Sequence, residues 1–300
     1  MKNLLKLMDL SEKEIVEILN TADQLKFEKK NGIPHRLLEG KVLGLIFAKS
    51  STRTRVSFEV GMFDLGGTSL FLSSRDLQIG RGEIVQDTAR VLSRYLDGIM
   101  IRTFDQREVE ALAEFGTIPI INGLTDYCHP CQVLADLMTI REYKGNIKGR
   151  KLCYIGDGNN MTNSLIVGGI KLGMEVSVAC PAGYEPDADI MKWAYESGRF
   201  SCSPDVLEMA QNSDVLYTDV WASMGQEGEA EERKKVFKSY QINDKVISVS
   251  KPDAMVLHCL PAHREEEITS KVFEEHSREI FDEAENRLHA QKAVLVKCLL

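Results

Sequence analysis

Short apolar runs alternate with helix-like segments along the whole chain, and this alternation restricts the possible folds more than any other feature. Strand-like runs cover residues 41–48, 68–72, 98–102 and 118–122, and a second series covers 151–155, 175–180, 215–218 and 255–260. Helical spacing follows several of them, over 56–65, 83–96 and 161–172. Strands that alternate with helices predict βαβ units and parallel sheets. We therefore expect an α/β protein.

The two series of strands indicate two domains. A chain of 300 residues is long enough for two domains of ordinary size, and Gly145–Arg150 forms a plausible boundary between the series. We expect a first domain over 1–145 and a second over 146–300, each a parallel sheet flanked by helices. Residues 11–30 predict an amphipathic helix that begins with a Ser11–Glu14 capping box, and 285–300 predict a terminal helix.

Composition and charge exclude several classes of protein. The chain is 43% hydrophobic and 27% charged, which is usual for a globular domain, and its formal charge of −8 disfavours a dedicated nucleic-acid surface. Lys6 and Asp9 interrupt the first apolar stretch too early for a signal peptide, and no run reaches the length of a membrane span. Any site for an anion must therefore be local.

Seven cysteines are scattered through the sequence, and this odd number favours reduced thiols in the cytoplasm over a disulfide framework. Cys128 and Cys131 have the C-x-x-C spacing of a redox pair or of half a zinc site. A zinc site needs a second pair of ligands at similar spacing, and the sequence has none. The redox interpretation stays open.

The segment Ser51–Arg55, which reads STRTR, lies where the first strand gives way to a helix. The first N–H groups of a helix are unpaired and carry the positive end of its dipole, so they attract anions. Three hydroxyls and two guanidinium groups add donors for phosphate or carboxylate oxygens. The alternative is that Ser51 and Thr52 only cap the helix. Capping does not need the arginines, so we expect a site for a small phosphorylated molecule.

Other polar residues follow the ends of neighbouring strands. Arg102 ends the third strand, and residues 126–132 follow the fourth. Ligands of parallel sheets bind beyond the carboxyl ends of the strands, so these residues can converge with Arg53. In the second half, Gly156 and Gly158 follow a strand as in a nicotinamide site, but Met161 stands where Gly or Ala is expected. The glycine-punctuated loop 221–229 is either a mobile lid over 222–232 or a solvated surface loop.

These features together resemble the aspartate/ornithine carbamoyltransferase family nearly from end to end, in order and spacing. The matching positions are Ser51–Thr54, Arg102, His129–Gln132, Asp157–Asn160, Asp219, Ser223–Gly225, His258–Pro261 and Glu285–Arg287. The resemblance implies a carbamoyl-phosphate domain and an amino-acid domain, with the helix 285–300 packing back on the first. It also implies a homotrimer or a multiple of one, and neither metal nor organic cofactor.

Within the family the second half looks like the ornithine-using branch, because Asp219 offers a carboxylate to an ammonium group. An aspartate-using member would need basic groups for a second carboxylate. The resemblance thus implies transfer of the carbamoyl group to the δ-amine of L-ornithine, giving L-citrulline and phosphate, as in arginine biosynthesis. The sequence does not decide between synthesis and breakdown of arginine. A non-catalytic relative that binds an anion and regulates a partner stays open as an alternative.

The resemblance also assigns residues to carbamoyl phosphate. Phosphate would bind at the 51–54 turn, and four donors would hold the carbonyl oxygen: Thr54, Arg102, His129 and Arg287. Gln132 and the carbonyls of Cys259 and Leu260 would accept from the NH₂ group. The full expected set is Ser51, Thr52, Arg53, Thr54, Gln78, Arg102, His129, Pro130, Cys131, Gln132, Cys259, Leu260 and Arg287. Gln78 would act from a neighbouring subunit, or else belong to a solvated loop.

For ornithine, the resemblance places Asn160, Ser223 and Met224 at the α-carboxylate and Asp219 at the α-ammonium. The expected catalytic groups are Arg102, His129, Cys259 and Arg287. A core role remains the alternative for His129, and a small buried apolar role for Cys259. The attacking δ-amine must lose a proton, and phosphate or Cys259 could assist.

Overall fold

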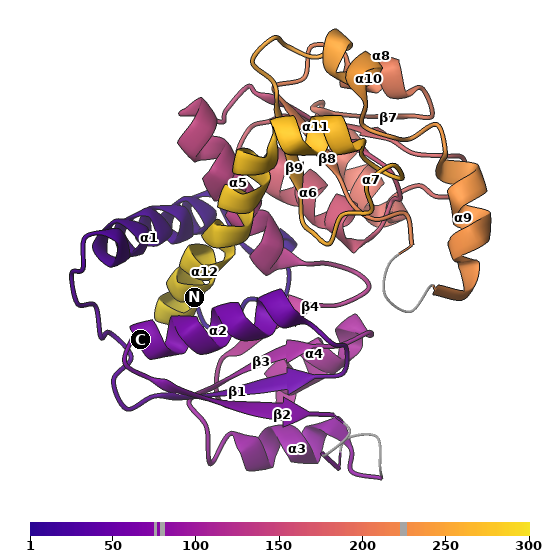
Figure 1. Cartoon of the computed structure of the whole chain (residues 1–300). Helices are drawn as coiled ribbons and strands as arrows, with labels where there is room; N and C mark the ends of the chain where they lie inside the picture. Colours follow the sequence, from indigo (N-terminus) through magenta and orange to yellow (C-terminus); the bar gives the residue numbers. More distant parts are fainter. Residues whose placement is uncertain (75–76, 79–81, 223–226) are drawn as a thin grey trace. The chain divides into compact units, whose positions relative to one another are not determined.

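The structure is a computed structural model that describes residues 1–74, 77–78, 82–222 and 227–300. The chain divides into two compact units, which are Met1–Ala135 with Arg287–Leu300 and Asp136–Asn286. We call them unit 1 and unit 2. Each contains one parallel β-sheet flanked by helices, so the predicted α/β class is confirmed (Figure 1). In the described part of the chain, no helix is both long enough and apolar enough to span a membrane.

The sheet of unit 1 has four parallel strands in the order β2-β1-β3-β4. The strands are β1 (Val42–Phe47), β2 (Thr68–Ser73), β3 (Gly98–Arg102) and β4 (Ile120–Leu124). The helical elements are η1 (Leu7–Asp9), α1 (Glu12–Lys30), α2 (Thr52–Asp64), α3 (Val85–Leu92), α4 (Gln106–Phe115), the first residues of α5 (Pro130–Lys144) and the C-terminal part of α12 (Ser277–Leu299).

Helices cover both faces of this sheet, which explains why its inner strands are apolar on both sides. On one face, α3 and α4 pack Ala89 and Leu112 against Ile46 and Ile99. On the other face lie α2 and the C-terminal part of α12. Gly61 of α2 lies so close to α12 that an added Cβ would be 3.3 Å from Lys292. Each fully buried aliphatic side chain in such layers contributes about 2 kcal/mol through removal from water.

The sheet of unit 2 has five parallel strands in the order β7-β6-β5-β8-β9. The strands are β5 (Lys151–Ile155), β6 (Glu175–Ala179), β7 (Phe200–Ser203), β8 (Val215–Thr218) and β9 (Met255–His258). The helices include α6 (Asn160–Lys171), α7 (Ala188–Glu196), α8 (Val206–Ala210), η2 (Glu227–Glu229), α9 (Ala230–Phe237), α10 (Asp244–Val249) and α11 (Ser270–Glu275).

The order of strands reverses once in each sheet, between β1 and β3 in unit 1 and between β5 and β8 in unit 2. Two neighbouring strands at such a point send their connections to opposite faces, which opens a crevice at their carboxyl ends. Arg102 ends β3, and Ser51, Asp157 and Asp219 lie shortly after β1, β5 and β8. The positions that the sequence motifs single out therefore lie at the carboxyl ends of these strands.

Some predicted boundaries are wrong. The terminal helix starts at Ser277 and not at residue 285, because its first turns are rich in charged residues that hide the helical pattern. One of them, Glu279, accepts a hydrogen bond from the N–H of Val256 at 2.8 Å. The fourth strand covers 120–124 and not 118–122, and the last strand ends at His258 and not at residue 260.

Candidate active site

The turn after β1 begins α2 with a capped end. Ser51 is the N-cap residue, and its Oγ accepts a hydrogen bond from the N–H of Thr54 at 3.2 Å. Arg55 is exposed, pairs with Glu59 at 2.9 Å and lies over the ring of Phe71 at 3.7 Å. Arg55 is thus occupied on the surface, whereas Arg53 is half-buried.

Thr54 contacts two arginines that are far apart from each other in the sequence. Its side chain is fully buried, and its Oγ1 accepts hydrogen bonds from Arg287 at 2.7 Å and from Arg102 at 3.4 Å. Arg102 comes from the end of β3 and Arg287 from α12, and both are buried. A hydroxyl has two lone pairs and one hydrogen. Both lone pairs are engaged, so this hydroxyl can interact with a further group only by donating its hydrogen.

His129 immediately precedes α5 and is buried in the same region of unit 1. Burial lowers its pKa well below the ordinary value of 6.5, and the positive charges of Arg287, Arg102 and Arg53 lower it further. Three guanidinium groups therefore lie near this one imidazole. At neutral pH the ring is uncharged and can donate one hydrogen bond without acting as an acid.

The first turn of α5 is buried as well, and it carries Pro130, Cys131 and Gln132. Cys131 Sγ donates to the carbonyl oxygen of Asn122 at 3.4 Å, which fastens this turn to β4. This contact holds the backbone of the turn in place, and the position of Gln132 is fixed with it. Gln78 differs from this group because it is exposed, and it is flanked by residues 75–76 and 79–81, which lie outside the described part.

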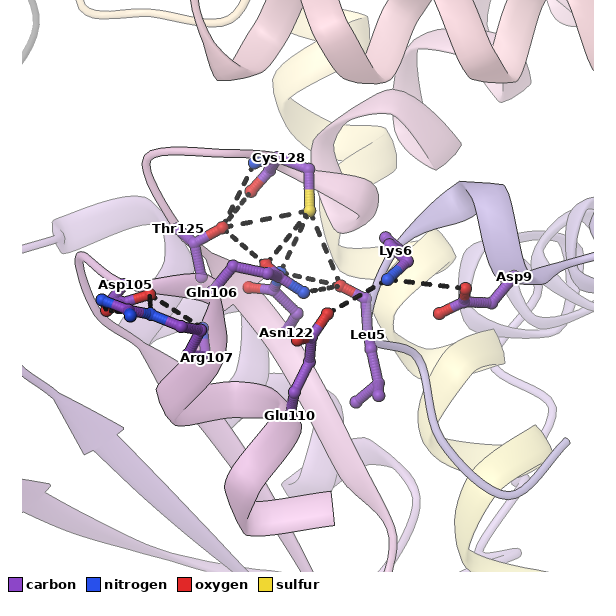
Figure 2. Close-up of polar contacts among 10 residues, drawn as sticks. All are labelled: Leu5, Lys6, Asp9, Asp105, Gln106, Arg107, Glu110, Asn122, Thr125 and Cys128. Atoms are coloured by element: carbon purple, nitrogen blue, oxygen red, sulfur yellow. Dashed lines mark hydrogen bonds and ion pairs between the residues drawn. The ribbon is translucent and has the colours of Figure 1, made fainter. Parts of the chain in front are cut away.

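Cys128 and Cys131 are poorly suited to redox chemistry. Figure 2 shows Cys128 Sγ facing the carbonyl oxygen of Leu5 and the side chain of Gln106, at 3.6 and 3.5 Å. Burial raises the pKa of both cysteines to about 12. The thiolate is the reactive form, so both sulfurs are largely inert at neutral pH. These thiols pack the loop between β4 and α5.

In unit 2, Asn159 caps α6 and also reaches the end of β8. Its Oδ1 accepts from the N–H of Met161 at 2.9 Å, and its Nδ2 donates to Asp219 Oδ2 at 3.1 Å. Asn160 is the first residue of the helix. The sequence motif indicated a role for Asn160 but not for Asn159. An Asn directly before an apolar helical run is a capping signal that would have identified it.

Asp219 is held from two further sides. Its Oδ1 accepts from the N–H of Val220 at 2.8 Å and from Cys259 Sγ at 3.0 Å. Burial raises the pKa of Cys259 well above its ordinary value, and the neighbouring Asp219 carboxylate raises it further. Cys259 is therefore a protonated thiol that donates to Asp219, and it is no proton acceptor at neutral pH.

The segment after β9 is fixed by His258, for which the sequence motif had indicated no individual role. The N–H of Leu260 donates to His258 Nδ1 at 2.9 Å, so the hydrogen of this ring is on Nε2 and points to Glu267 at 2.9 Å. Both His258 and Glu267 are buried. Leu260 has a φ of 57°, a left-handed conformation that costs a branched residue roughly 1 kcal/mol. The His258–Glu267 pair holds this strained backbone in place.

Asp219, His258 and Cys259 offer possible metal ligands within 4.8 Å of one another. Both nitrogens of the His258 ring are already hydrogen-bonded, and the Cys259 proton is shared with Asp219. A metal ion would have to displace these contacts. The arrangement fits a hydrogen-bonded support for the backbone better than a coordination site.

The turn after β5 does not suit a dinucleotide. In such sites the second glycine lets the pyrophosphate approach the backbone. Here the chain itself fills that space, since a Cβ on Gly158 would lie 2.3 Å from the backbone atoms of Glu185 and Pro186. Nearby, Asp157 pairs with Arg233 at 2.8 Å, and Arg233 also donates to the carbonyl oxygen of Trp221 at 3.1 Å. Ser223 and Met224, predicted at the substrate carboxylate, lie outside the described residues.

Comparison with known families gives two adjoining matches. Residues 2–142 match the family described as aspartate/ornithine carbamoyltransferase, carbamoyl-P binding domain. Residues 148–298 match the family described as aspartate/ornithine carbamoyltransferase, Asp/Orn binding domain. The two matches together cover nearly the whole chain.

Similar proteins match this chain over nearly their whole length. An ornithine carbamoyltransferase of Pyrococcus abyssi is 55% identical, with 99% of this chain and 96% of that protein covered. A solved ornithine carbamoyltransferase of Pyrococcus furiosus is 56% identical with a TM-score of 0.94, covering 98% of this chain and 96% of that one. A solved anabolic ornithine carbamoyltransferase of Campylobacter jejuni is 41% identical with a TM-score of 0.93, covering 99% of both chains. This chain belongs to the aspartate/ornithine carbamoyltransferase family.

Proposed function

We propose that this chain is the enzyme that transfers the carbamoyl group of carbamoyl phosphate to the δ-amine of L-ornithine, giving L-citrulline and phosphate. The observation that carries the assignment is the group formed by Thr54, Arg102, Arg287 and His129 in unit 1. Relatives at 55% and 56% identity that are named ornithine carbamoyltransferases support the choice of acceptor.

The phosphate group of the substrate binds at the start of α2, among the backbone amides of residues 51–54 and the hydroxyls of Ser51 and Thr52, with the Thr54 hydroxyl beside the carbonyl group. Arg53 adds a positive charge that is half-buried and therefore less screened than a surface charge. The bond to phosphate breaks during the reaction, so the leaving group gains negative charge. Donors that strengthen as this charge develops lower the barrier as well as bind the substrate.

The carbonyl oxygen of the carbamoyl group receives hydrogen bonds from Thr54, Arg102, Arg287 and His129. Thr54 is suited to this because the two arginines occupy its lone pairs and leave its hydrogen to donate. His129 is suited because its depressed pKa keeps the ring neutral, so it polarises the carbonyl without transferring a proton. Each donor of this kind typically lowers the barrier by about 3 kcal/mol.

The carbamoyl NH₂ group is oriented by acceptors. We assign this role to Gln132 and to the backbone carbonyls of Cys259 and Leu260, with Pro130 and Cys131 shaping the α5 turn. The strained backbone at Leu260 supports the assignment, because such a conformation is kept where the surrounding structure imposes it. His258 and Glu267 are then the residues that position this segment.

Ornithine binds through unit 2, with its α-ammonium on Asp219 and its α-carboxylate on Asn160, Ser223 and Met224. Three hydrogen bonds from Asn159, Val220 and Cys259 fix the Asp219 carboxylate and leave lone-pair capacity for an ammonium group. The δ-amine has an ordinary pKa of about 10.4 and must attack without its proton. Departing phosphate accepts that proton, since Cys259 is already protonated.

We further propose the division into a carbamoyl-phosphate domain over 1–145 and an ornithine domain over 146–300, with the helix at 285–300 packing on the first.

We also propose a homotrimer or a multiple of one in the cytoplasm, acting in arginine biosynthesis. The exposed Gln78 supports the trimer, because it can serve a neighbouring copy. Relatives named anabolic support the direction. Sedimentation at about three times 33.7 kDa would support the assembly, and a monomer would refute it.

The test of the reaction is an assay of ureido product. Purified protein is incubated with carbamoyl phosphate and, separately, ornithine, aspartate, putrescine or N-acetylornithine. We expect product with ornithine, and preference for another amine would refute the acceptor. The variant Arg102→Gln removes a buried charge at the end of β3, and Arg55→Gln serves as a matched control that removes an exposed charge in the first turn of α2. Equal activity of both variants would refute the proposed site.

A further inference from the structure

Two cysteines of unit 2 that the proposed reaction does not use lie in contact with each other. Cys180 directly follows β6, and Cys202 is in β7, the strand at the edge of the sheet. Cys202 is paired with Val178, so Cys180 is its diagonal neighbour on the adjacent strand. The two sulfur atoms are 3.7 Å apart. A disulfide bond is about 2.0 Å long, so the sulfurs need to approach by roughly 1.7 Å.

The two thiols are not equivalent. Cys180 is buried, whereas Cys202 is partly exposed on an edge strand that reagents in water can reach. Either sulfur can donate its S–H group to the other, and when Cys180 donates, the pKa of Cys202 is lowered and that of Cys180 is raised. Burial raises the pKa of Cys128, Cys131, Cys153 and Cys298 to about 12. Cys202 is therefore the sulfur best placed to react first.

We infer that Cys180 and Cys202 form a reversible oxidation site that closes to a disulfide when the protein meets a peroxide. The Cys202 thiolate attacks one oxygen of hydrogen peroxide, which breaks the O–O bond, forms a sulfenic acid and releases hydroxide. The sulfur of Cys180 then attacks the Cys202 sulfur, and its proton goes to the departing sulfenic oxygen, which leaves as water. The hydroxide released earlier takes up the proton that Cys202 lost when its thiolate formed. Two thiols give up two electrons, and one peroxide becomes two waters.

Acidic side chains near Cys180 and Cys202 slow the oxidation of this pair, because they disfavour the thiolate form. Glu185 raises the pKa of both thiols, and Asp157 raises that of Cys180. Peroxide sensors keep positive charges beside their thiolates, and here the acting charges are acidic. We therefore expect oxidation over minutes at millimolar peroxide.

The crosslink would lie in the segment that contacts the turn before Asn160, one of the proposed ornithine residues. Cys180 opens the segment 180–187, whose Tyr184 carbonyl accepts from the N–H of Gly158 at 2.8 Å. In the same segment, the N–H of Asp187 donates to Asn163 Oδ1 at 3.0 Å. A bond from Cys180 to β7 would tie this segment to the sheet edge.

The experiment counts thiols in the full-length chain. Native protein is treated with hydrogen peroxide, quenched with catalase, denatured and titrated with a thiol reagent. We expect seven reactive thiols before treatment and five after it, with dithiothreitol restoring all seven. Peptide mapping without reductant is expected to show one crosslinked pair that contains Cys180 and Cys202. The Cys298→Ser variant, altered in unit 1, serves as the matched control and should also lose two thiols.

The Cys202→Ser variant should lose none of its thiols under the same treatment. The Cys180→Ser variant should stop at a sulfenic acid, which dimedone traps on residue 202. Retention of seven thiols in the wild-type chain would overturn the inference, as would a crosslink between other cysteines or an equal loss in Cys202→Ser. Because the readout is thiol chemistry, it does not depend on the carbamoyl transfer proposed above.

Discussion

Thr54 provides the sharpest test of the site, because one hydroxyl holds two buried arginines and, we propose, donates to the substrate. Valine has nearly the same shape, so Thr54→Val removes the hydroxyl and leaves the volume. The loss of one donor to a developing oxyanion typically lowers kcat by 10²–10³-fold. The guanidinium groups of Arg287 and Arg102 also lose an acceptor, at 2.7 and 3.4 Å. The shorter contact alone is worth roughly 1.5–3 kcal/mol of folding free energy.

We expect Thr54→Val to lower kcat by roughly two to three orders of magnitude and to lower the midpoint of thermal unfolding. The Michaelis constant for ornithine should stay near the wild-type value, because Thr54 lies in unit 1 and the Asp219 group in unit 2. The assay is the initial rate of citrulline formation at saturating carbamoyl phosphate, well below the unfolding midpoint of the variant. Thr54→Ser keeps the hydroxyl and serves as control, with a loss of less than about tenfold.

The outcome that would refute this reasoning is a folded Thr54→Val protein whose kcat stays within threefold of the wild type. The two arginines would then bind substrate without the hydroxyl between them. A drop of equal size in Thr54→Ser would also contradict the argument, because it would show that keeping the hydroxyl does not preserve the activity.

Three further predictions concern other parts of the chain. The depressed pKa of His129 means that near pH 6.5 the unfolded chain binds a proton that the folded chain does not, so the contribution of this site to unfolding free energy falls as pH drops below 6.5. Urea titrations at pH 7.5 and 5.5 should show a larger loss for the wild type than for His129→Gln, and equal losses would contradict this. Asp219→Asn should raise the Michaelis constant for ornithine roughly 10–100-fold and leave that for carbamoyl phosphate nearly unchanged; parallel changes in both would speak against an ammonium site. Gly158→Ala should destabilise the protein by roughly 2–4 kcal/mol in urea unfolding, because the new Cβ meets backbone at 2.3 Å, whereas Gly228→Ala, with open space around it, should change stability by less than about 0.5 kcal/mol.

The sheets were predictable from sequence because their strands are short apolar runs with helical segments between them. Residues 98–102 and 151–155 match β3 and β5 residue for residue. Helix α5 was not identified, because all of its first ten residues are buried and the helix has no exposed face there to produce an amphipathic pattern. The first turns of α12 were missed because some of their buried positions hold acidic residues, which in sequence look like exposed positions. One of them is Glu283, which accepts hydrogen bonds from Tyr217 and from the N–H of His258.

The site was partly predictable in the same way. A local motif and a family resemblance singled out Thr54 and Arg287, but their hydrogen bond joins residues 233 positions apart, and no local pattern encodes such a pairing. The roles of His258 and Glu267 were missed because a buried imidazole–carboxylate pair looks in sequence like two ordinary polar residues. The contact of Arg233 with Asp157 was missed because a helical arginine beside glutamates resembles a surface residue.

The positive charges of Arg53, Arg102 and Arg287 all lower the pKa of His129, so the three guanidinium groups lie near one another. Arg102, Arg287 and His129 are buried, so water screens these charges only weakly. Their mutual repulsion opposes folding of unit 1, although the chain as a whole is acidic. Neutral replacements at these positions would relieve that repulsion and weaken the attraction for a dianion. Selection for stability would therefore favour neutral residues at these three positions, whereas selection for catalysis would favour arginine.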